Sequence, residues 1–208
     1  MHLLIRCVPI EALPAIQMQR NRRLAGWGVI PSDSPLEQPW DRYSRYIAAW
    51  QDGADTTRDR PAGMVGVTMP GAGHYAFELH LPFPHPALPT THRAELAEGQ
   101  NLFIASGFRK SGLGLVLAYI APLLARAHGA RWLVMENDKT VPAMIPESAW
   151  RDTGIVTNHT GDVPAHLMVG RVTDILAVFA NAFHATMERS HIVFADELSG
   201  LIPRNRPG

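Results

Sequence analysis

The hydrophobic residues of this chain follow two different patterns. Short apolar runs bounded by glycine, proline or polar clusters predict strands at residues 2–8, 43–50, 64–69, 98–106, 131–136 and 166–172. Apolar residues spaced three and four positions apart predict helices at residues 10–24, 112–129, 140–152 and 174–188. Together these patterns predict an α/β protein.

The order of these elements indicates how the sheet is built. The runs at 43–50 and 64–69 are joined by a polar segment, which predicts an antiparallel hairpin. The strand at 98–106, the helix at 112–129 and the strand at 131–136 predict a parallel strand–helix–strand unit. We therefore expect a mixed sheet with an antiparallel front half, a central parallel unit and helices on both faces.

Composition fits a single domain over residues 1–208, because 208 residues of which 46% are hydrophobic can bury one sizeable core. Nineteen Lys and Arg balance nineteen Asp and Glu, so no net charge favours nucleic acid or an anionic membrane as a partner. The apolar stretch at 113–127 contains Pro122 and is too short to span a bilayer. A single cysteine, Cys7, and the lack of a signal-peptide pattern lead us to expect a cytoplasmic protein.

Two loop segments are candidates for function. Residues 26–41 contain three prolines, two glycines and two tryptophans, and we expect them to form a mobile loop folded over a site. Residues 70–93 carry His74, His80, His85 and His92. Their spacing matches neither a helical histidine pair nor a zinc pattern, so we predict no metal.

The glycine turn at residues 109–114, RKSGLG, follows a strand and begins a helix. Backbone N–H groups at such a turn have no helical acceptor, which makes the turn a candidate site for phosphate. A nucleotide P-loop is excluded, because Leu113 and Gly114 replace the required Lys and hydroxyl residue. A dinucleotide-binding loop is excluded because Leu117 stands where its third glycine belongs. An ordinary strand–helix turn with solvent-facing Arg109 and Lys110 remains an alternative.

A third pattern, R/Q-x-x-G-x-G/A, fits at Arg109, Gly112 and Gly114, and residues 98–137 resemble the acyl-CoA pyrophosphate loop of the GNAT acyltransferases. The resemblance implies that the loop binds the pyrophosphate and that the strand backbone at 102–105 binds the pantetheine arm and offers an oxyanion donor. The cofactor-binding residues implied are Phe103, Ile104, Arg109, Lys110, Ser111, Gly112, Leu113, Gly114 and Asn137.

A second resemblance covers most of residues 19–172 and concerns the acyl-homoserine-lactone (autoinducer) synthases, a GNAT-fold family. Arg23, Trp27, Glu37, Asp41 and Glu98 match that family by position and type. The resemblance implies an N-acyltransferase that moves an acyl group from acyl-CoA or an acyl carrier protein thioester to a small amine, in autoinducer synthesis and quorum sensing.

The sequence also departs from that family. The segment Val67-Thr68-Met69 and Asn101 stand where the family has arginines. Their absence puts the usual acceptor, S-adenosylmethionine, in question and leaves a changed amine acceptor as an alternative. A basic surface for a carrier protein is expected from Arg20, Arg22, Arg23, Arg109 and Lys110.

Glu98 is the residue that the resemblance implies as general base, with Glu95 and Glu136 as rivals. Trp27, Phe77 and Phe83 are expected to wall an acyl or acceptor pocket, and Asp41 to bind a cationic acceptor or to cap its loop. The tyrosine that serves as general acid in many GNAT enzymes is missing, because the four tyrosines lie at 43, 46, 75 and 119. Two alternatives to an enzyme are a catalytically silent GNAT-fold binding or sensor module for acyl-CoA and a purely structural module.

Overall fold

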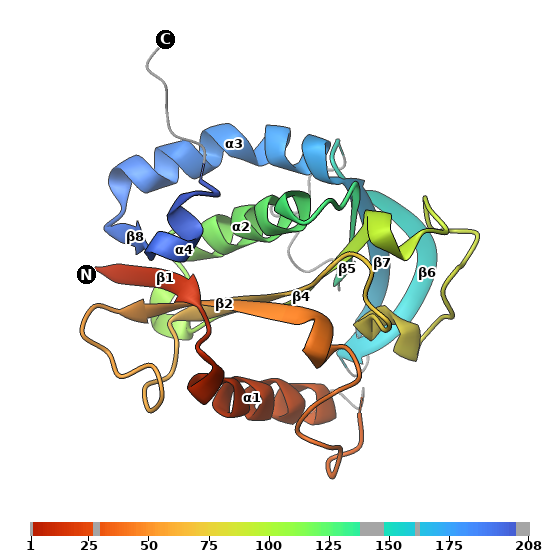
Figure 1. Cartoon of the computed structure of the whole chain (residues 1–208), viewed down its shortest axis with the longest axis horizontal. Coiled ribbons are helices and arrows are strands. Elements are labelled where there is room, and N and C mark those ends of the chain that lie inside the picture. Colours follow the sequence, from red (N-terminus) through yellow and green to blue (C-terminus); the bar gives the residue numbers. More distant parts are fainter. Residues whose placement is uncertain (1, 27–29, 138–147, 161–162, 203–208) are drawn as a thin grey trace.

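The structure is a computed structural model that describes residues 2–26, 30–137, 148–160 and 163–202. Within these residues one sheet has the strand order β6-β7-β5-β4-β3-β2-β1-β8 (Figure 1). The strands are β1 (Leu3–Cys7), β2 (Ser44–Gln51), β3 (Gly63–Thr68), β4 (Leu96–Ile104), β5 (Trp132–Asn137), β6 (Arg151–Thr160), β7 (Val163–Arg171) and β8 (Ile192–Phe194). The helices are α1 (Leu13–Gly26), α2 (Leu113–Ala127), α3 (Val172–Arg189) and α4 (Asp196–Ser199).

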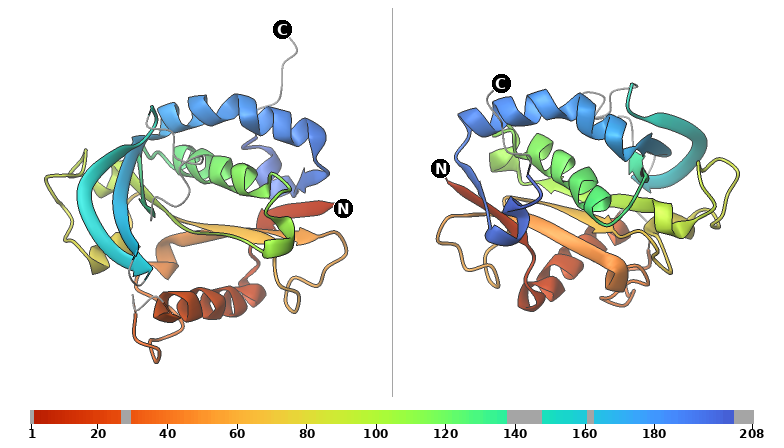
Figure 2. Two further views of the ribbon diagram at one scale, coloured as in Figure 1. Left: turned by 180° about the vertical axis from the view of Figure 1, so that it is seen from behind. Right: turned by 45° about the horizontal axis from the view of Figure 1, so that its top comes forward.

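The predicted architecture is confirmed. β1 to β4 form an antiparallel front half, and β4 and β5 are parallel strands connected by α2. α1 covers one face of the sheet, whereas α2 and α3 cover the other (Figures 1 and 2). Helices therefore lie on both faces, as the order of the elements indicates.

One predicted element is wrong. Most of the helix expected at 140–152 lies outside the described residues, but its last two positions, Arg151 and Asp152, begin strand β6. The sequence obscured this strand because Gly154, at φ +77°, interrupts its alternation, and the pairing of β6 with β7 shifts register between Asp152 and Val156. The short elements β8 and α4 were not predicted either, because three or four residues carry too little periodicity.

Each face of the sheet has its own apolar core. On the α2 side, Ile47, Val67 and Ala97 pack with α2 and α3. On the α1 side, Tyr46 and Trp50 pack with the helix. Because side chains alternate between the faces of a strand, the register places Ser44, Thr68 and Glu98 side by side on the α1 face.

The proline-rich segment 70–93 packs onto this α1 face, on the part of the sheet that α1 does not reach. Tyr75 and Phe77 from this segment share a buried cluster with Leu96, Val134 and Leu167. The Tyr75 hydroxyl donates to the carbonyl of Leu96 at 2.7 Å. These contacts place a 3₁₀ turn, Ala76–Leu79, directly against β4.

Candidate functional site

The parallel strands β4 and β5 stay together only at their beginning. The ladder between them runs from Leu96–Trp132 to Glu98–Val134, although β4 continues to Ile104 and β5 to Asn137. On its other side β4 pairs with β3 up to Ile104. In the described structure, no ladder therefore joins β4 residues 99–104 to β5 residues 135–137. We refer to this place as the β4–β5 separation, where an extended ligand can take the missing backbone bonds.

A β-bulge lies on β4 at this separation. Met64 is opposite Phe103 and Gly66 is opposite Gln100, so Val65 faces two residues, Asn101 and Leu102. Asn101 has φ +55°, in the left-handed region where Asn is better tolerated than most residues other than glycine. A bulge turns backbone groups away from the regular ladder, so it can aim an N–H group at a bound carbonyl. No pattern in the sequence indicated the bulge, and Asn101 stood out there only as a replacement of a family arginine.

Glu98 lies at the end of the paired part of β4 and is 2% exposed. Its carboxyl oxygens accept hydrogen bonds from the backbone N–H groups of Ala76 (2.6 Å) and Phe77 (2.8 Å), at the start of the 3₁₀ turn. Burial raises the pKa of Glu98 to about 8, although the two backbone hydrogen bonds work in the opposite direction. A carboxylate with a raised pKa suits a general base.

A second buried carboxyl group faces the same side of the sheet. Glu136 follows Val134 by two positions on β5, so it lies on the face that carries Glu98. Its side chain is 14% exposed, and its Oε1 lies 3.8 Å from Nε2 of His80. Burial raises the pKa of Glu136 well above its ordinary value, and the negative charge of Glu98 adds to the shift. His80 appeared in the sequence only as a loop histidine, so its position beside Glu136 could not be foreseen.

A row of polar side chains extends from Glu98 toward α1. Thr68 Oγ1 lies 2.9 Å from Ser44 Oγ, and the Gln100 amide donates to both oxygens at 2.9 Å. Thr68 and its neighbour Val67 are each 0% exposed, and Val67 belongs to the core on the opposite face. Both positions are therefore filled by fully buried side chains that are smaller than the arginine of the resembled family.

Asp41 is part of a buried ionic cluster. Its carboxylate forms an ion pair with Arg20 and accepts hydrogen bonds from the Tyr46 hydroxyl at 2.6 Å and the backbone N–H of Gln38 at 2.7 Å. These contacts hold the segment before β2 against α1. Arg20 is 1% exposed, so its expected place in a basic surface for a carrier protein is wrong. A role of Asp41 in acceptor binding stays a prediction.

The aromatic residues expected to wall a pocket lie in different places. Trp27 is outside the described residues. Phe77 is 0% exposed and stacks on Tyr75 with ring centroids 5.3 Å apart. Phe83 is partly buried under the guanidinium of Arg93, 4.6 Å from its ring centroid. Phe77 and Phe83 therefore pack against neighbouring side chains. Their roles in a pocket remain predictions.

The glycine turn has the backbone geometry that the sequence predicts. It follows a 3₁₀ turn, Ser106–Phe108, and Gly112 is the N-cap residue of α2. Ser111 Oγ accepts a weak hydrogen bond from the N–H of Leu113, at 3.3 Å. Among the described residues the N–H groups of Lys110, Gly112 and Gly114 have no acceptor, and the side chains of Arg109 and Lys110 are exposed. The turn can therefore offer N–H groups and two cations to an anion.

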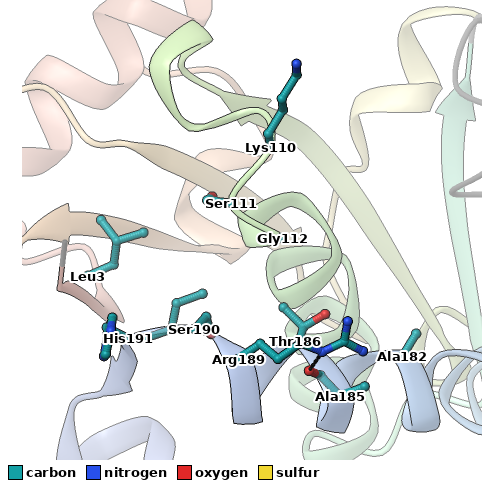
Figure 3. A pocket seen from close by; sticks show the side chains of 11 residues that line it. Leu3, Lys110, Ser111, Gly112, Ala182, Ala185, Thr186, Arg189, Ser190 and His191 are labelled. Carbon is teal, nitrogen blue, oxygen red and sulfur yellow. Dashed lines mark hydrogen bonds between the residues drawn. The ribbon is translucent and has the colours of Figure 1, made fainter.

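Gly112 is required for a reason other than ligand access. It has φ +79°, and a Cβ atom at this position would lie 2.5 Å from Cγ2 of Thr186 on α3. Its missing side chain thus points toward α3, beside a cavity of about 560 Å³ between the turn and the end of α3 (Figure 3). Lys110 points away from the other residues that line this cavity, and Arg189 bends back to the carbonyl of Ala185. The cavity therefore lacks the inward-facing cations that an anion site needs.

The remaining predicted cofactor residues are placed as follows. Leu113 is 0% exposed, so only its backbone is available to a ligand. Ile104 packs against the core on the α2 side, and the ring of Phe103 lies 5.3 Å below the guanidinium carbon of Arg23. Asn137 ends β5 opposite His166 of β7. Contacts of these residues with a cofactor remain predictions.

Neither a metal cluster nor a membrane-spanning helix is found in the part of the chain that the structure describes. No group of three or more His, Cys, Asp or Glu side chains there could hold a metal ion. No helix there is long and apolar enough to cross a membrane.

Comparison with known proteins finds no matching family model and no matching curated protein, whereas solved structures do match. The CoA-dependent acyl-homoserine lactone synthase MesI is 16% identical, with a TM-score of 0.57 over 92% of this chain and 99% of MesI. BjaI, a CoA-dependent acyl-homoserine lactone synthase solved with SAM and isopentyl-CoA, is 10% identical, with a TM-score of 0.61 over 96% of this chain and 98% of BjaI. TofI, solved with an inhibitor and MTA, is 14% identical, with a TM-score of 0.57 over 86% of this chain and 97% of TofI.

At these identities the likeness shows the fold. The chain shares its fold with these solved structures, which confirms the GNAT-like mixed α/β fold predicted from the sequence.

Proposed function

We propose that this chain is an N-acyltransferase that moves an acyl group from an acyl thioester to a small amine. The observation that carries the proposal is the buried Glu98 carboxyl group at the point where β4 and β5 separate. A protonated amine must lose a proton before its nitrogen can attack a thioester, and a base with a raised pKa beside the thioester serves this purpose. The unpaired strand edge of β4 is suited to an extended pantetheine arm, and the glycine turn to its pyrophosphate.

The arrangement divides the two substrates between the two faces of the sheet. The glycine turn begins α2, which lies on one face, whereas Glu98 points to the other face. The thioester therefore enters from the α2 side and reaches through the β4–β5 separation, and the amine approaches from the α1 side. The bulge at Asn101 supplies a backbone N–H group for the oxyanion.

We propose acyl-CoA as the donor and SAM as the first acceptor to test. Two of the structural neighbours are CoA-dependent acyl-homoserine lactone synthases, and one of these was solved with SAM and isopentyl-CoA. Acyl carrier protein remains a second donor to test. More specifically, we propose that the reaction synthesises an autoinducer for quorum sensing and takes place in the cytoplasm.

The test measures thiol release from a panel of acyl-CoAs and acyl carrier protein thioesters, each mixed with SAM or with simple amines. Product masses identify the acceptor. We expect turnover by the wild type and a loss of about 10²- to 10⁴-fold in Glu98→Gln, the usual contribution of a general base. Glu188→Gln, which changes an exposed carboxylate on α3, is the matched control.

Two other results would contradict the proposal. If the protein binds CoA but releases no thiol with any acceptor, it is a binding or sensor module. If CoA neither binds nor raises the thermal midpoint, the fold serves a structural role.

A further inference from the structure

Glu136 borders the β4–β5 separation at the level of the bulge. The last paired residues are Glu98 and Val134, so Gln100 and Glu136, two positions further on each strand, lie at corresponding levels. The bulge at Asn101 follows immediately on the β4 side. A thioester held at the bulge therefore has the Glu136 carboxyl group on the opposite side.

The hydrogen-bond partners of the two carboxyl groups suit different protonation states. Both oxygens of Glu98 accept from backbone N–H groups, which can only donate, so this site suits a carboxylate. Glu136 instead forms a hydrogen bond with Thr157, and its Oε1 lies 3.8 Å from Nε2 of His80, beyond hydrogen-bond distance. The Thr157 hydroxyl also lies 3.4 Å from the carbonyl of Ala165. When it donates its proton to that carbonyl, it can accept from a protonated Glu136, whereas a hydrogen bond donated to Glu136 lowers the pKa of that carboxyl group.

The charges around Glu136 favour its protonated form. Glu98 on β4 repels a negative charge on Glu136, and burial of both groups makes two adjacent charges costly. Glu78 on the 3₁₀ turn adds to the repulsion at Glu98, although Arg93 pairs with it. Burial lowers the pKa of His80, so the imidazole brings no positive charge to compensate. Two carboxyl groups coupled in this way lose their protons in separate steps, so one can act as base while the other still holds a proton to act as acid.

We propose that Glu136 is the general acid that works with Glu98 as the general base. This inference rests on the proposed acyl transfer. The amine nitrogen bonds to the thioester carbon and gives its N–H proton to Glu98. The carbon–sulfur bond then breaks with its electron pair on sulfur, and the protonated Glu136 gives its proton to that sulfur. One proton passes from Glu98 back to Glu136, so the cycle yields amide and thiol without a further reactant.

His80 is a positioning residue in this arrangement. Its side chain is 21% exposed, and it connects the buried Glu136 with solvent. It can therefore carry the proton that Glu98 releases back to Glu136 between turnovers. This arrangement also explains how the chain manages without a tyrosine in the position usual for GNAT enzymes.

The test varies the leaving group. The same acyl group is offered as an alkyl thioester, acyl-CoA, and as an aryl thioester whose thiolate leaves without a proton. With acyl-CoA we expect Glu136→Gln to lower kcat/KM by about 10²-fold, the lower end of general-acid contributions. With the aryl thioester the ratio of Glu136→Gln to wild type should return close to one, whereas Glu98→Gln should stay impaired with both donors.

Two further measurements distinguish a role of Glu136 and His80 in proton transfer from a role in folding. The alkaline fall of kcat/KM in the wild type, where Glu136 loses its proton, should be missing in Glu136→Gln. His80→Ala should regain activity with added imidazole. Thermal midpoints and CoA binding of each variant, with Glu188→Gln beside them, report on folding.

Equal losses in Glu136→Gln with both thioesters, or no loss with either, would overturn this role while leaving the acyltransferase proposal intact. A wild type that releases no thiol from any donor would overturn both.

Discussion

The two faces of the sheet carry charged and polar groups of different kinds. On the α2 side, the glycine turn offers unpaired backbone N–H groups and exposed cations. On the α1 side, the groups are buried side chains: the carboxyls of Glu98 and Glu136, and the ion pair of Arg20 and Asp41. Exposed charges contribute little to stability, whereas buried charges are costly to leave unpaired. Changes on the α1 side should therefore alter folding and pH dependence, and changes at the exposed cations should alter ligand affinity.

The largest effect on stability is expected from Asp41→Asn. It leaves the guanidinium of Arg20 buried without its counter-charge, which typically costs about 3–5 kcal/mol of unfolding free energy. Urea unfolding measures the loss. Asp33→Asn, an exposed position in the same segment, should leave the unfolding free energy unchanged. A small loss at Asp41 would mean that water reaches Arg20.

The next effect concerns the pH dependence of stability. Burial raises the pKa of Glu98 from its ordinary value of 4.5 to about 8, so between these values the folded state keeps a proton that the unfolded chain has lost. The free energy of unfolding should therefore fall as pH rises through this window and level off above it, by on the order of a few kcal/mol.

Urea midpoints at about pH 5, 7 and 9 should show a smaller decline in Glu98→Gln than in the wild type. The remaining decline belongs largely to Glu136, whose pKa is also raised. Equal slopes in the two proteins would show that Glu98 ionises in the folded state near its ordinary pKa.

Gly112 lies in the turn that is proposed to bind the ligand, but we expect Gly112→Ala to lower the stability of the protein itself. The left-handed backbone costs about 1–2 kcal/mol for any residue with a Cβ atom, and the new atom would also press on Thr186. Thr186→Ala in the same chain should recover the part due to this contact. Gly107→Ala, where nothing lies within 4 Å of the new atom, is the control. A stable Gly112→Ala protein with weakened CoA binding would show that the glycine is needed for the ligand instead.

The smallest effect on stability is expected from Lys110→Ala. The exposed ammonium contributes at most about 1 kcal/mol to an anion, so CoA affinity should fall no more than about fivefold. This loss should shrink as salt is added. Isothermal titration measures it, and the unfolding free energy should change by less than about 0.5 kcal/mol. Arg126→Ala, an exposed cation at the far end of α2, should change neither quantity.

The glycine turn could be predicted because its determinants are consecutive. Arg109, Gly112 and Gly114 lie within six positions, between a strand and a helix that each show clear periodicity. Local geometry is all that such a turn needs. Even so, the reason for one of its glycines was hidden, because Thr186, the residue that excludes a side chain at Gly112, is 74 positions later in the chain.

The opposite side of the site could be predicted only in part. Glu98 was identified by resemblance, but the turn that holds its carboxyl group comes from the proline-rich segment at 70–93, which has no regular pattern. Arg20 looked like a surface residue on an amphipathic helix, because the sequence does not show that Asp41 pairs with it. His80 and Glu136 are 56 positions apart, and no spacing links them.

By itself the sequence determined the mixed α/β order, the parallel strand–helix–strand unit and the glycine turn before α2, because each depends on contacts between near neighbours in the chain. The tertiary structure decided where β4 and β5 separate, which carboxyl groups are buried together on one face, and which charged residues are interior. These properties depend on burial and on the charges of distant residues, and both exist only once the sheet is assembled.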